Sequence, residues 1–216
     1  MLVLLDLSAA FDTVNHTILL QRLQTKIGIR GIALDWFASY LADRSQQISI
    51  RRVLSDAFEL NCGVLQGSCL GPLLFTIYTS KLFDIVDNHL PNVHCYADDT
   101  QLYLSFKPGS DVTQLAAVKA MDNCISDIRA WMLHDKLMIN DDKTEFLIIG
   151  TKQQLAKLSV DNLKIGSCSI APSTSVRNLG ALFDSKLCMS SHITKACSIS
   201  FFHLIIVLAS FYPRIH

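Results

Sequence analysis

The sequence predicts an α+β fold in which a βαββαβ sheet carries helices on one face. The predicted elements follow the order strand, helices, strands, helix, hairpin, helix and strand, which is the order of such a sheet. The 216 residues are half apolar, which is enough for one sizeable core or two small ones. No repeat and no linker rich in Pro, Gly or Ser divides the chain.

The first quarter of the chain predicts a strand, two helices and a strand pair. Residues 1–5 are uniformly apolar, as expected of a central strand that is covered on both faces. Apolar residues recur at helical spacing over 14–27, and a second helix is predicted over 32–41, after Gly31. Residues 46–60, QQISIRRVLSDAFEL, alternate like two strands with an exposed connection.

The middle of the chain predicts a loop, a helix, a hairpin and a long helix. The loop from Asn61 is punctuated by glycine, and Pro72 suits the first turn of the helix that follows, where a missing N–H is harmless. Two apolar, β-rich runs within 92–106 meet at Asp98-Asp99, which indicates a hairpin. A helix is expected from about 111 to 133. The later expected elements are a loop and strand in 137–150, short strands in 163–170 and 176–184, and a helix from about Ser190.

Charge and cysteine content narrow the functional classes. Nineteen basic residues balance nineteen acidic ones, so any site for a polyanion must be local. Seven cysteines, with no Cys-x-x-Cys pair, fit neither a disulfide framework nor a zinc site, and we expect reduced thiols. The amino terminus lacks a basic leader, and the apolar run 199–212 is short and interrupted by Ser and His. We expect an intracellular protein, nuclear or cytoplasmic, that is not secreted and has no membrane partner.

Three carboxylates follow or join predicted strands. Asp6 closes the first apolar run, and Asp98 and Asp99 lie at the hairpin turn. Buried carboxylates repel one another unless a cation compensates them, and oxygen ligands favour Mg²⁺ or Mn²⁺. Because side chains alternate along a strand, we expect Asp6 and Asp98 to be the principal shared ligands and Asp99 to be secondary. Two metals about 3.5–4 Å apart would then serve an in-line displacement. An Asp-Asp pair is also common in ordinary turns.

Other residues admit both a structural and a functional interpretation. Asp12 precedes the first helix and is as suited to capping as to a site, and Phe11 suits the core. Gln66-Gly67 lies in the glycine-rich loop, where Gln66 could contact a nucleotide or brace the loop. Lys143 is either a solvated charge or a group that neutralises or protonates a leaving phosphate.

Five stretches resemble, in their order, the palm of a reverse transcriptase, most closely that of non-LTR, LINE-type retrotransposons. They span residues 2 to about 195, and five ordered motifs are far more specific than one. The stretches are LLDLSAAFDTVNHTILLQRL, GVLQGSCLGPLLFTIYTSKL, YADDTQLY, WMLHDKLMINDDKTEFLIIG and VRNLGALFDSKLCMSSHITK.

The resemblance implies a role for each matching residue. Asp6 matches the first metal-binding aspartate, and Asp98-Asp99 match the pair of the family's signature. Phe11 matches the bulky residue under the incoming sugar, which screens against a 2′-hydroxyl. Gln66-Gly67 match the loop that lines nucleotide and template, and Lys143 matches the lysine near the leaving pyrophosphate.

The resemblance also implies a reaction and its partners. The implied reaction is RNA-templated DNA synthesis, in which nucleotides are transferred from deoxynucleoside triphosphates to a primer 3′-hydroxyl. The implied mechanism uses two metal ions, Mg²⁺ or Mn²⁺. An RNA template and a DNA primer are therefore expected; the oligomeric state is left open.

The expected domain is a ferredoxin-like palm over residues 1–195, with primer-grip-like strands near 176–184 and a divergent apolar tail over 196–216. Against the family pattern, the fingers region is expected to be missing and the thumb truncated. Activity of the isolated chain is therefore left open. The alternatives are a catalytically inactive, truncated remnant or interaction protein that keeps the palm fold, and another two-metal nucleotidyl enzyme.

Overall fold

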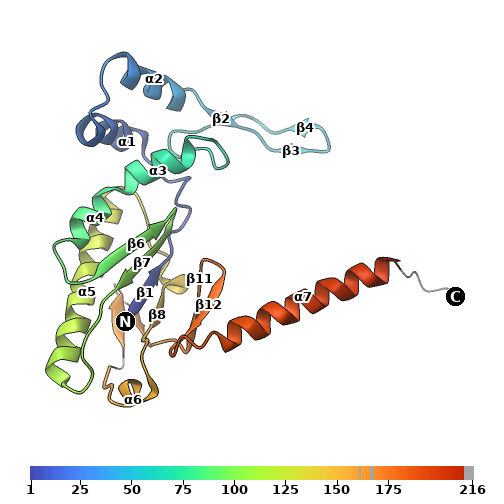
Figure 1. Ribbon diagram of the computed structural model, residues 1–216. Coiled ribbons are helices and arrows are strands. Elements are labelled where there is room, and N and C mark those ends of the chain that lie inside the picture. The colour runs from blue at the N-terminus through green and yellow to red at the C-terminus, as the bar shows by residue number, and fades with distance from the viewer. Residues whose placement is uncertain (161, 166–167, 212–216) are drawn as a thin grey trace.

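The centre of the molecule is a four-stranded antiparallel sheet (Figure 1). The computed structural model describes residues 1–160, 162–165 and 168–211. The first sheet strand in the sequence lies between the third and the fourth, as in a βαββαβ ferredoxin-like sheet, so the predicted fold class is confirmed. In spatial order the strands are β6 (Asn92–Tyr96), β7 (Asp99–Tyr103), β1 (Leu2–Leu5) and β8 (Glu145–Leu147).

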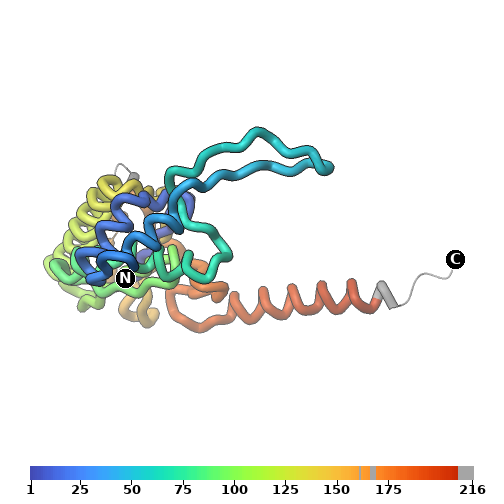
Figure 2. Tube along the Cα trace, turned by 90° about the horizontal axis from the view of Figure 1, so that it is seen from above, coloured from blue at the N-terminus to red at the C-terminus, as the bar shows by residue number. Residues whose placement is uncertain are grey.

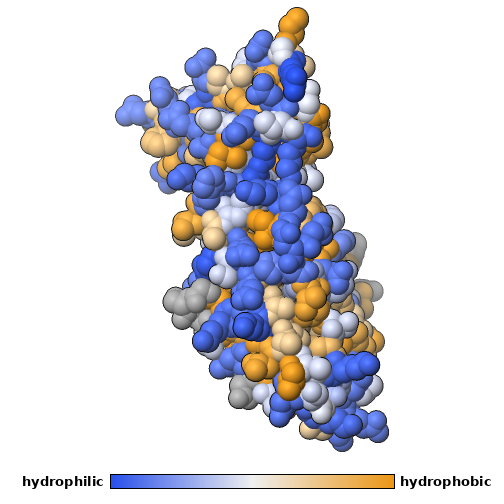
Figure 3. Space-filling model, turned by 90° about the vertical axis from the view of Figure 1, so that its left-hand side faces the viewer, coloured by the Kyte–Doolittle hydropathy of each residue, from blue (hydrophilic) through white to orange (hydrophobic). Residues whose placement is uncertain are grey.

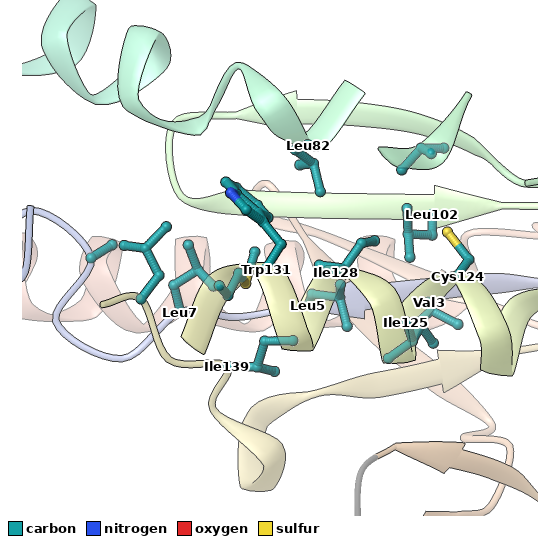
Figure 4. Packing of buried hydrophobic residues seen from close by; sticks show 14 of the residues in the cluster. Val3, Leu5, Leu7, Leu82, Leu102, Cys124, Ile125, Ile128, Trp131 and Ile139 are labelled. Carbon is teal, nitrogen blue, oxygen red and sulfur yellow. The ribbon is translucent and has the colours of Figure 1, made fainter. Parts of the chain in front are cut away.

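One face of this sheet is covered by α4 (Lys81–Val86) and α5 (Asp111–His134). Val3 and Leu5 point from β1 into this layer, where they meet Ile125 and Ile128 of α5 (Figure 4). All four side chains are buried, and each such burial contributes roughly 1.5–3 kcal/mol. The apolar face of α5 therefore packs against the sheet along most of the length of β1.

The opposite face of the sheet is mostly open. Its small apolar cluster consists of Leu2, Leu147 and Val176, the last from the hairpin of β11 (Ser175–Asn178) and β12 (Ala181–Asp184). The hairpin is also tied to the sheet by the amide of Gln101, which donates to Asn178 Oδ1 at 2.9 Å. Next to this hairpin, the open face leaves room for polar side chains.

A second group of helices lies beyond one end of the sheet (Figure 1). The N-cap of α1 is Asn15, whose side chain accepts from Ile18 N, so the capping role considered for Asp12 belongs to Asn15. Pro72 lies in the first turn of α3, as predicted. The group comprises α1 (His16–Arg22), the turn η1 (Leu23–Ile27), α2 (Ile32–Leu41) and α3 (Gly71–Thr79).

A buried ion pair joins this group to the end of α5. Arg22 at the end of α1 pairs with Asp135 just after α5, and their side chains are only 9% and 4% exposed. The Asp135 carboxylate also accepts from Trp131 Nε1 and, at 2.7 Å, from the imidazole of His134. The hydroxyl of Tyr78 in α3 donates to the backbone carbonyl of Asp135. Asp135 therefore ties together α1, α3 and α5, through its carboxylate and its backbone carbonyl.

A two-stranded ribbon extends from the molecule. It is formed by two paired segments, and its strand residues are all exposed (Figures 1 and 2). The predicted strand pair over 46–60 is confirmed, with the connection at Arg51 and Arg52. The strands are β2 (Ser45–Gln46), β3 (Ser49–Ile50), β4 (Val53–Leu54) and β5 (Phe58–Glu59).

The last part of the chain holds short elements and one long helix. Residues 166–167 of the strand segment predicted over 163–170 lie outside the described residues. The predicted boundary at 195/196 falls within the last helix, and residues 212–216 of the predicted tail are also outside the description. The elements besides β11 and β12 are η2 (Asp141–Lys143), α6 (Lys152–Leu155), β9 (Leu163–Ile165), β10 (Cys168–Ile170) and α7 (Ser190–Phe211).

Helix α7 projects from the body on the same side as the ribbon (Figure 2). By length and composition alone it could cross a membrane, since the window Ser190–Leu208 has a mean hydropathy of 1.5 and none of it is buried. The expected absence of a membrane partner therefore stays a prediction. The side of the molecule next to α4 and α5 instead shows hydrophilic residues with scattered hydrophobic ones (Figure 3).

We predict that Asp135→Ala lowers the free energy of unfolding by about 3–5 kcal/mol, because it leaves the buried Arg22 guanidinium without its counter-charge. Urea denaturation measures the change. The control is Asp127→Ala, since Asp127 pairs with His89 on the surface and its side chain is 64% exposed. That variant should lose at most about 1 kcal/mol. Equal losses in the two variants would contradict a clamp at Asp135.

Candidate active site

Asp6 lies at the end of the central strand, between groups from both neighbouring strands. Leu5 pairs with Thr100 of β7, so one further step along β1 brings Asp6 beside Asp99. On the other side Leu4 pairs with Glu145 of β8, and the chain leading into β8 holds Lys143. Lys143 Nζ lies 3.5 Å from Asp6 Oδ2. Two long-range strand pairings thus converge on one carboxylate.

The alternation of β7 directs Asp99 to the open face. Thr100 and Leu102 are buried toward the helices, whereas Asp99 and Gln101 lie on the other face. Tyr96 pairs with Asp99, so Ala97 and Asp98 form a two-residue turn. Ala97 has a φ of 54°, a left-handed conformation that costs an alanine roughly 1–2 kcal/mol. The hairpin turn therefore lies one residue earlier than the Asp98-Asp99 junction at which the sequence indicated it.

A cavity of about 400 Å³ opens beside Asp6 and Asp99 on this face. Its floor is the end of the sheet, and one wall is the β11–β12 hairpin. Asp98 is not among the lining residues. The charged and polar residues that line it are Asp6, Asp99, Thr100, Gln101, Asp142, Lys143, Glu145, Arg177 and Asn178.

The carboxylates in this cavity are only partly compensated by cations. Burial raises the pKa of Asp99 above the ordinary aspartate value, and the negative charges of Asp98 and Asp6 raise it further. Asp6 Oδ2 is buried and accepts no hydrogen bond. The ammonium of Lys143 pairs with Asp6, but its side chain is 69% exposed, so water screens it, and Arg177 is a second cation in the lining. An oxygen in this position favours an added cation.

The donor set fits a hard divalent ion that takes further ligands from its substrate. Mg²⁺ is usually held by one or two carboxylates together with water and substrate phosphates, rather than by a complete protein cage. Among the described residues, no group of three His, Cys, Asp or Glu side chains is arranged to hold a metal ion. Asp6 and Asp99, with Asp98 adjacent, supply oxygen donors at one edge of the sheet. These donors are sufficient for a site whose remaining ligands are water and substrate phosphates.

The remaining predicted site residues lie elsewhere. The ring of Phe11 stacks on that of Phe75, with centroids 4.7 Å apart, and packs against the core. Gln66 lines a second cavity of about 310 Å³, together with Asp12. Gly67, next in the loop, has a φ of 87°, which suits glycine. The predicted residues are therefore not all in one cavity: Asp6, Asp99 and Lys143 line the first and Gln66 lines the second, whereas Asp98, Phe11 and Gly67 line neither.

Sequence reasoning missed several lining residues. Glu145 and Arg177 line the carboxylate cavity, and Arg44 lines the cavity of Gln66. Glu145 lies two residues after Lys143, at the start of β8, and this closeness in sequence could have indicated it. Arg177 and Arg44 had no such signal, because their positions depend on how hairpins fold back.

The sequence matches the family described as Reverse transcriptase (RNA-dependent DNA polymerase) over residues 1–183. Two Drosophila melanogaster proteins are similar. The probable RNA-directed DNA polymerase from transposon BS is 28% identical over 147 residues, which is 66% of this chain and 16% of that protein. The RNA-directed DNA polymerase from mobile element jockey is 26% identical over 195 residues, 88% of this chain and 20% of that protein. The chain thus spans a fifth or less of these relatives.

Solved telomerase structures share the fold. The apo telomerase of Candida tropicalis, truncated from its C-terminal domain, aligns with a TM-score of 0.55 and 16% identity over 88% of this chain and 34% of that one. The telomerase of Candida albicans, in complex with a TWJ fragment of telomeric RNA, aligns with a TM-score of 0.56 and 12% identity over 86% and 30%. At these identities the likeness concerns the fold alone.

We predict that Asp99→Asn stabilises the metal-free protein near pH 7 by less than about 1 kcal/mol, because solvent screens much of the repulsion. The raised pKa of Asp99 means that the folded state favours its protonated form, so its ionisation weakens the wild type as the pH rises. Urea denaturation in EDTA from pH 3 to pH 7 should show a gain that is full above the raised pKa of Asp99, shrinks as the pH falls through that pKa, and vanishes below about pH 3.9, the ordinary aspartate pKa. A gain that grows toward acid pH would contradict this assignment.

Proposed function

The chain belongs to the reverse transcriptase (RNA-dependent DNA polymerase) family, and we propose that it is the palm of an RNA-directed DNA polymerase from a LINE-type retrotransposon. The observation that carries the proposal is the convergence of Asp6, Asp99 and Lys143 on one cavity at the end of the central strand. The names of the two Drosophila relatives support the polymerase activity and the mobile-element origin.

The proposed metal ligands are Asp6, Asp98 and Asp99. From the sequence pattern, we propose Asp6 and Asp98 as the principal pair and Asp99 as secondary. Asp98 is close enough to Asp99 for its charge to raise the pKa of that carboxyl, which supports one shared site. The two Mg²⁺ or Mn²⁺ ions would activate the primer 3′-hydroxyl and neutralise charge on the phosphates.

The other residues would position and neutralise the substrates. Lys143 is exposed and can move between Asp6 and a leaving pyrophosphate, whose charge it would balance. The ring of Phe11, held against Phe75, would lie beneath the incoming sugar and exclude a 2′-hydroxyl. The loop of Gln66 and Gly67 would line the nucleotide and the template. The proposed substrates are deoxynucleoside triphosphates, a DNA primer and an RNA template, in an intracellular compartment.

We predict that Asp6→Asn and Asp98→Asn each reduce primer extension on an RNA template by at least about a hundredfold, because a lost ligand removes several kcal/mol of charge stabilisation. Asp99→Asn should lose less. Incorporation of radiolabelled deoxynucleotide with Mg²⁺ or Mn²⁺ measures the activity, and Asp127→Asn, on the outer surface of α5, is the control.

Calorimetric titration with Mn²⁺ provides a readout that does not need activity. Binding by the wild type that disappears in Asp6→Asn supports the metal site even if the isolated chain does not extend primers. Wild-type binding with no extension would favour a catalytically inactive scaffold. Identical titrations of the wild type and Asp6→Asn would refute the metal site, and incorporation on DNA but never on RNA templates would indicate a different polymerase class.

A further inference from the structure

The second cavity is built where three separate segments meet. The base of the ribbon supplies Arg44, the turn after β1 supplies Asp12, and the loop after β5 supplies Gln66. Backbone hydrogen bonds hold these segments together: Leu60 N donates to Arg44 O at 2.8 Å, and Gly63 N donates to Val14 O at 2.7 Å. The cavity walls are therefore parts of the fold rather than loose loop ends.

Glycine is needed at the closest point of this junction. Gly63 has a φ of 90°, and a Cβ added there would lie 3.0 Å from the Asp12 carbonyl oxygen. Val64 N also donates to Phe11 O at 2.8 Å. The loop of Gln66 is thus bonded directly to the segment that leaves Asp6, so the two cavities are held at a constant spacing.

The guanidinium of Arg44 is oriented in advance. Its Nε donates to the carbonyl of Tyr40 at 2.7 Å, and its central carbon lies 4.4 Å from the centroid of the Tyr40 ring. That ring stacks in turn on Trp36, with centroids 5.5 Å apart and an angle of 15° between the planes. Arg44 is therefore the last member of a stacked column, and much of its rotamer freedom is already lost.

Within the described residues, the charge of Arg44 has no carboxylate partner. In this respect Arg44 differs from Arg22 and Lys143, each of which is paired with a carboxylate. Its terminal N–H groups make no hydrogen bond to described residues, and Arg44 lines a cavity whose other polar residues include Gln46, Gln66 and Asp12. A fixed guanidinium fork with uncharged amides nearby suits the oxygens of a phosphodiester.

We propose that Arg44 binds a backbone phosphate of the template strand in this cavity, and that Tyr40 positions the guanidinium of Arg44. This proposal rests on the polymerase function proposed above. Asp12 is the acidic group that lines the same cavity, and its carboxylate would repel the phosphate. Arg44 and Asp12 therefore act on template affinity with opposite signs. Because the contact is to the backbone, it adds affinity without reading the sequence.

We predict that Arg44→Ala weakens binding of an RNA template annealed to a DNA primer by roughly tenfold to a hundredfold, the loss expected for a charge-assisted hydrogen bond. The slope of log K against log salt should fall by about 1. Asp12→Asn should strengthen binding. Fluorescence anisotropy of a labelled primer-template, measured over a range of salt concentrations, gives both quantities. Arg44→Lys keeps the charge but not the fork, and it should recover only part of the affinity.

Arg30→Ala is the matched control, since it removes the same charge from an exposed position outside the cavity. If Arg44→Ala and Arg30→Ala behave alike while the wild type binds and extends the primer, the inference on Arg44 fails and the polymerase function stands. If Arg44→Ala instead raises the KM for deoxynucleotide and leaves template affinity unchanged, the phosphate belongs to the nucleotide and the template assignment is overturned. Absence of wild-type binding to the primer-template would overturn both proposals.

Discussion

The pairing of β1 on both sides is the constraint on which the site depends. β1 is only four residues long, but its antiparallel register with β7 and with β8 decides what flanks Asp6. The same alternation sends Val3 and Leu5 into the helical layer and leaves Leu4 and Asp6 toward the open face. Burial of the one set therefore fixes the orientation of the other, and the carboxylates are held at the edge of the sheet by the core beneath them.

The two cavities are linked by a short, well-bonded part of the chain. Asp6 O accepts from Asn140 N at 2.8 Å, and a few residues later the chain bonds to the loop of Gln66. The Arg22–Asp135 pair then fixes the helices beyond this turn against the end of α5. A strand bound near Arg44 would consequently keep a defined position relative to Asp6, since packed elements on both sides resist displacement.

Much of the fold could be predicted from local patterns, whereas only part of the site could. Helix spacing in α2 and α5, the Pro72 signal of α3 and the apolar run of β1 each depend on neighbouring residues, and the structure has these elements where they were expected. The grouping of Asp6 with Glu145 and Arg177 depends on contacts across the sheet and on a hairpin that folds back over it. Arg44 is still less predictable, since its cavity is shaped by three segments distant in sequence.

The two-residue turn at Ala97 and Asp98 constrains the number of residues between β6 and β7 more than it constrains which residues they are. A point substitution there leaves the pairing of Tyr96 with Asp99 possible, whereas one inserted or deleted residue would shift β7 by one place against β6 or β1. Every side chain of β7 would then exchange faces, with Asp99 turned toward α5 and Leu102 toward solvent. Among diverging copies of such a chain, insertions or deletions of one residue at this turn should be far rarer than substitutions. Copies that keep the two-residue turn are those whose sheets can still form.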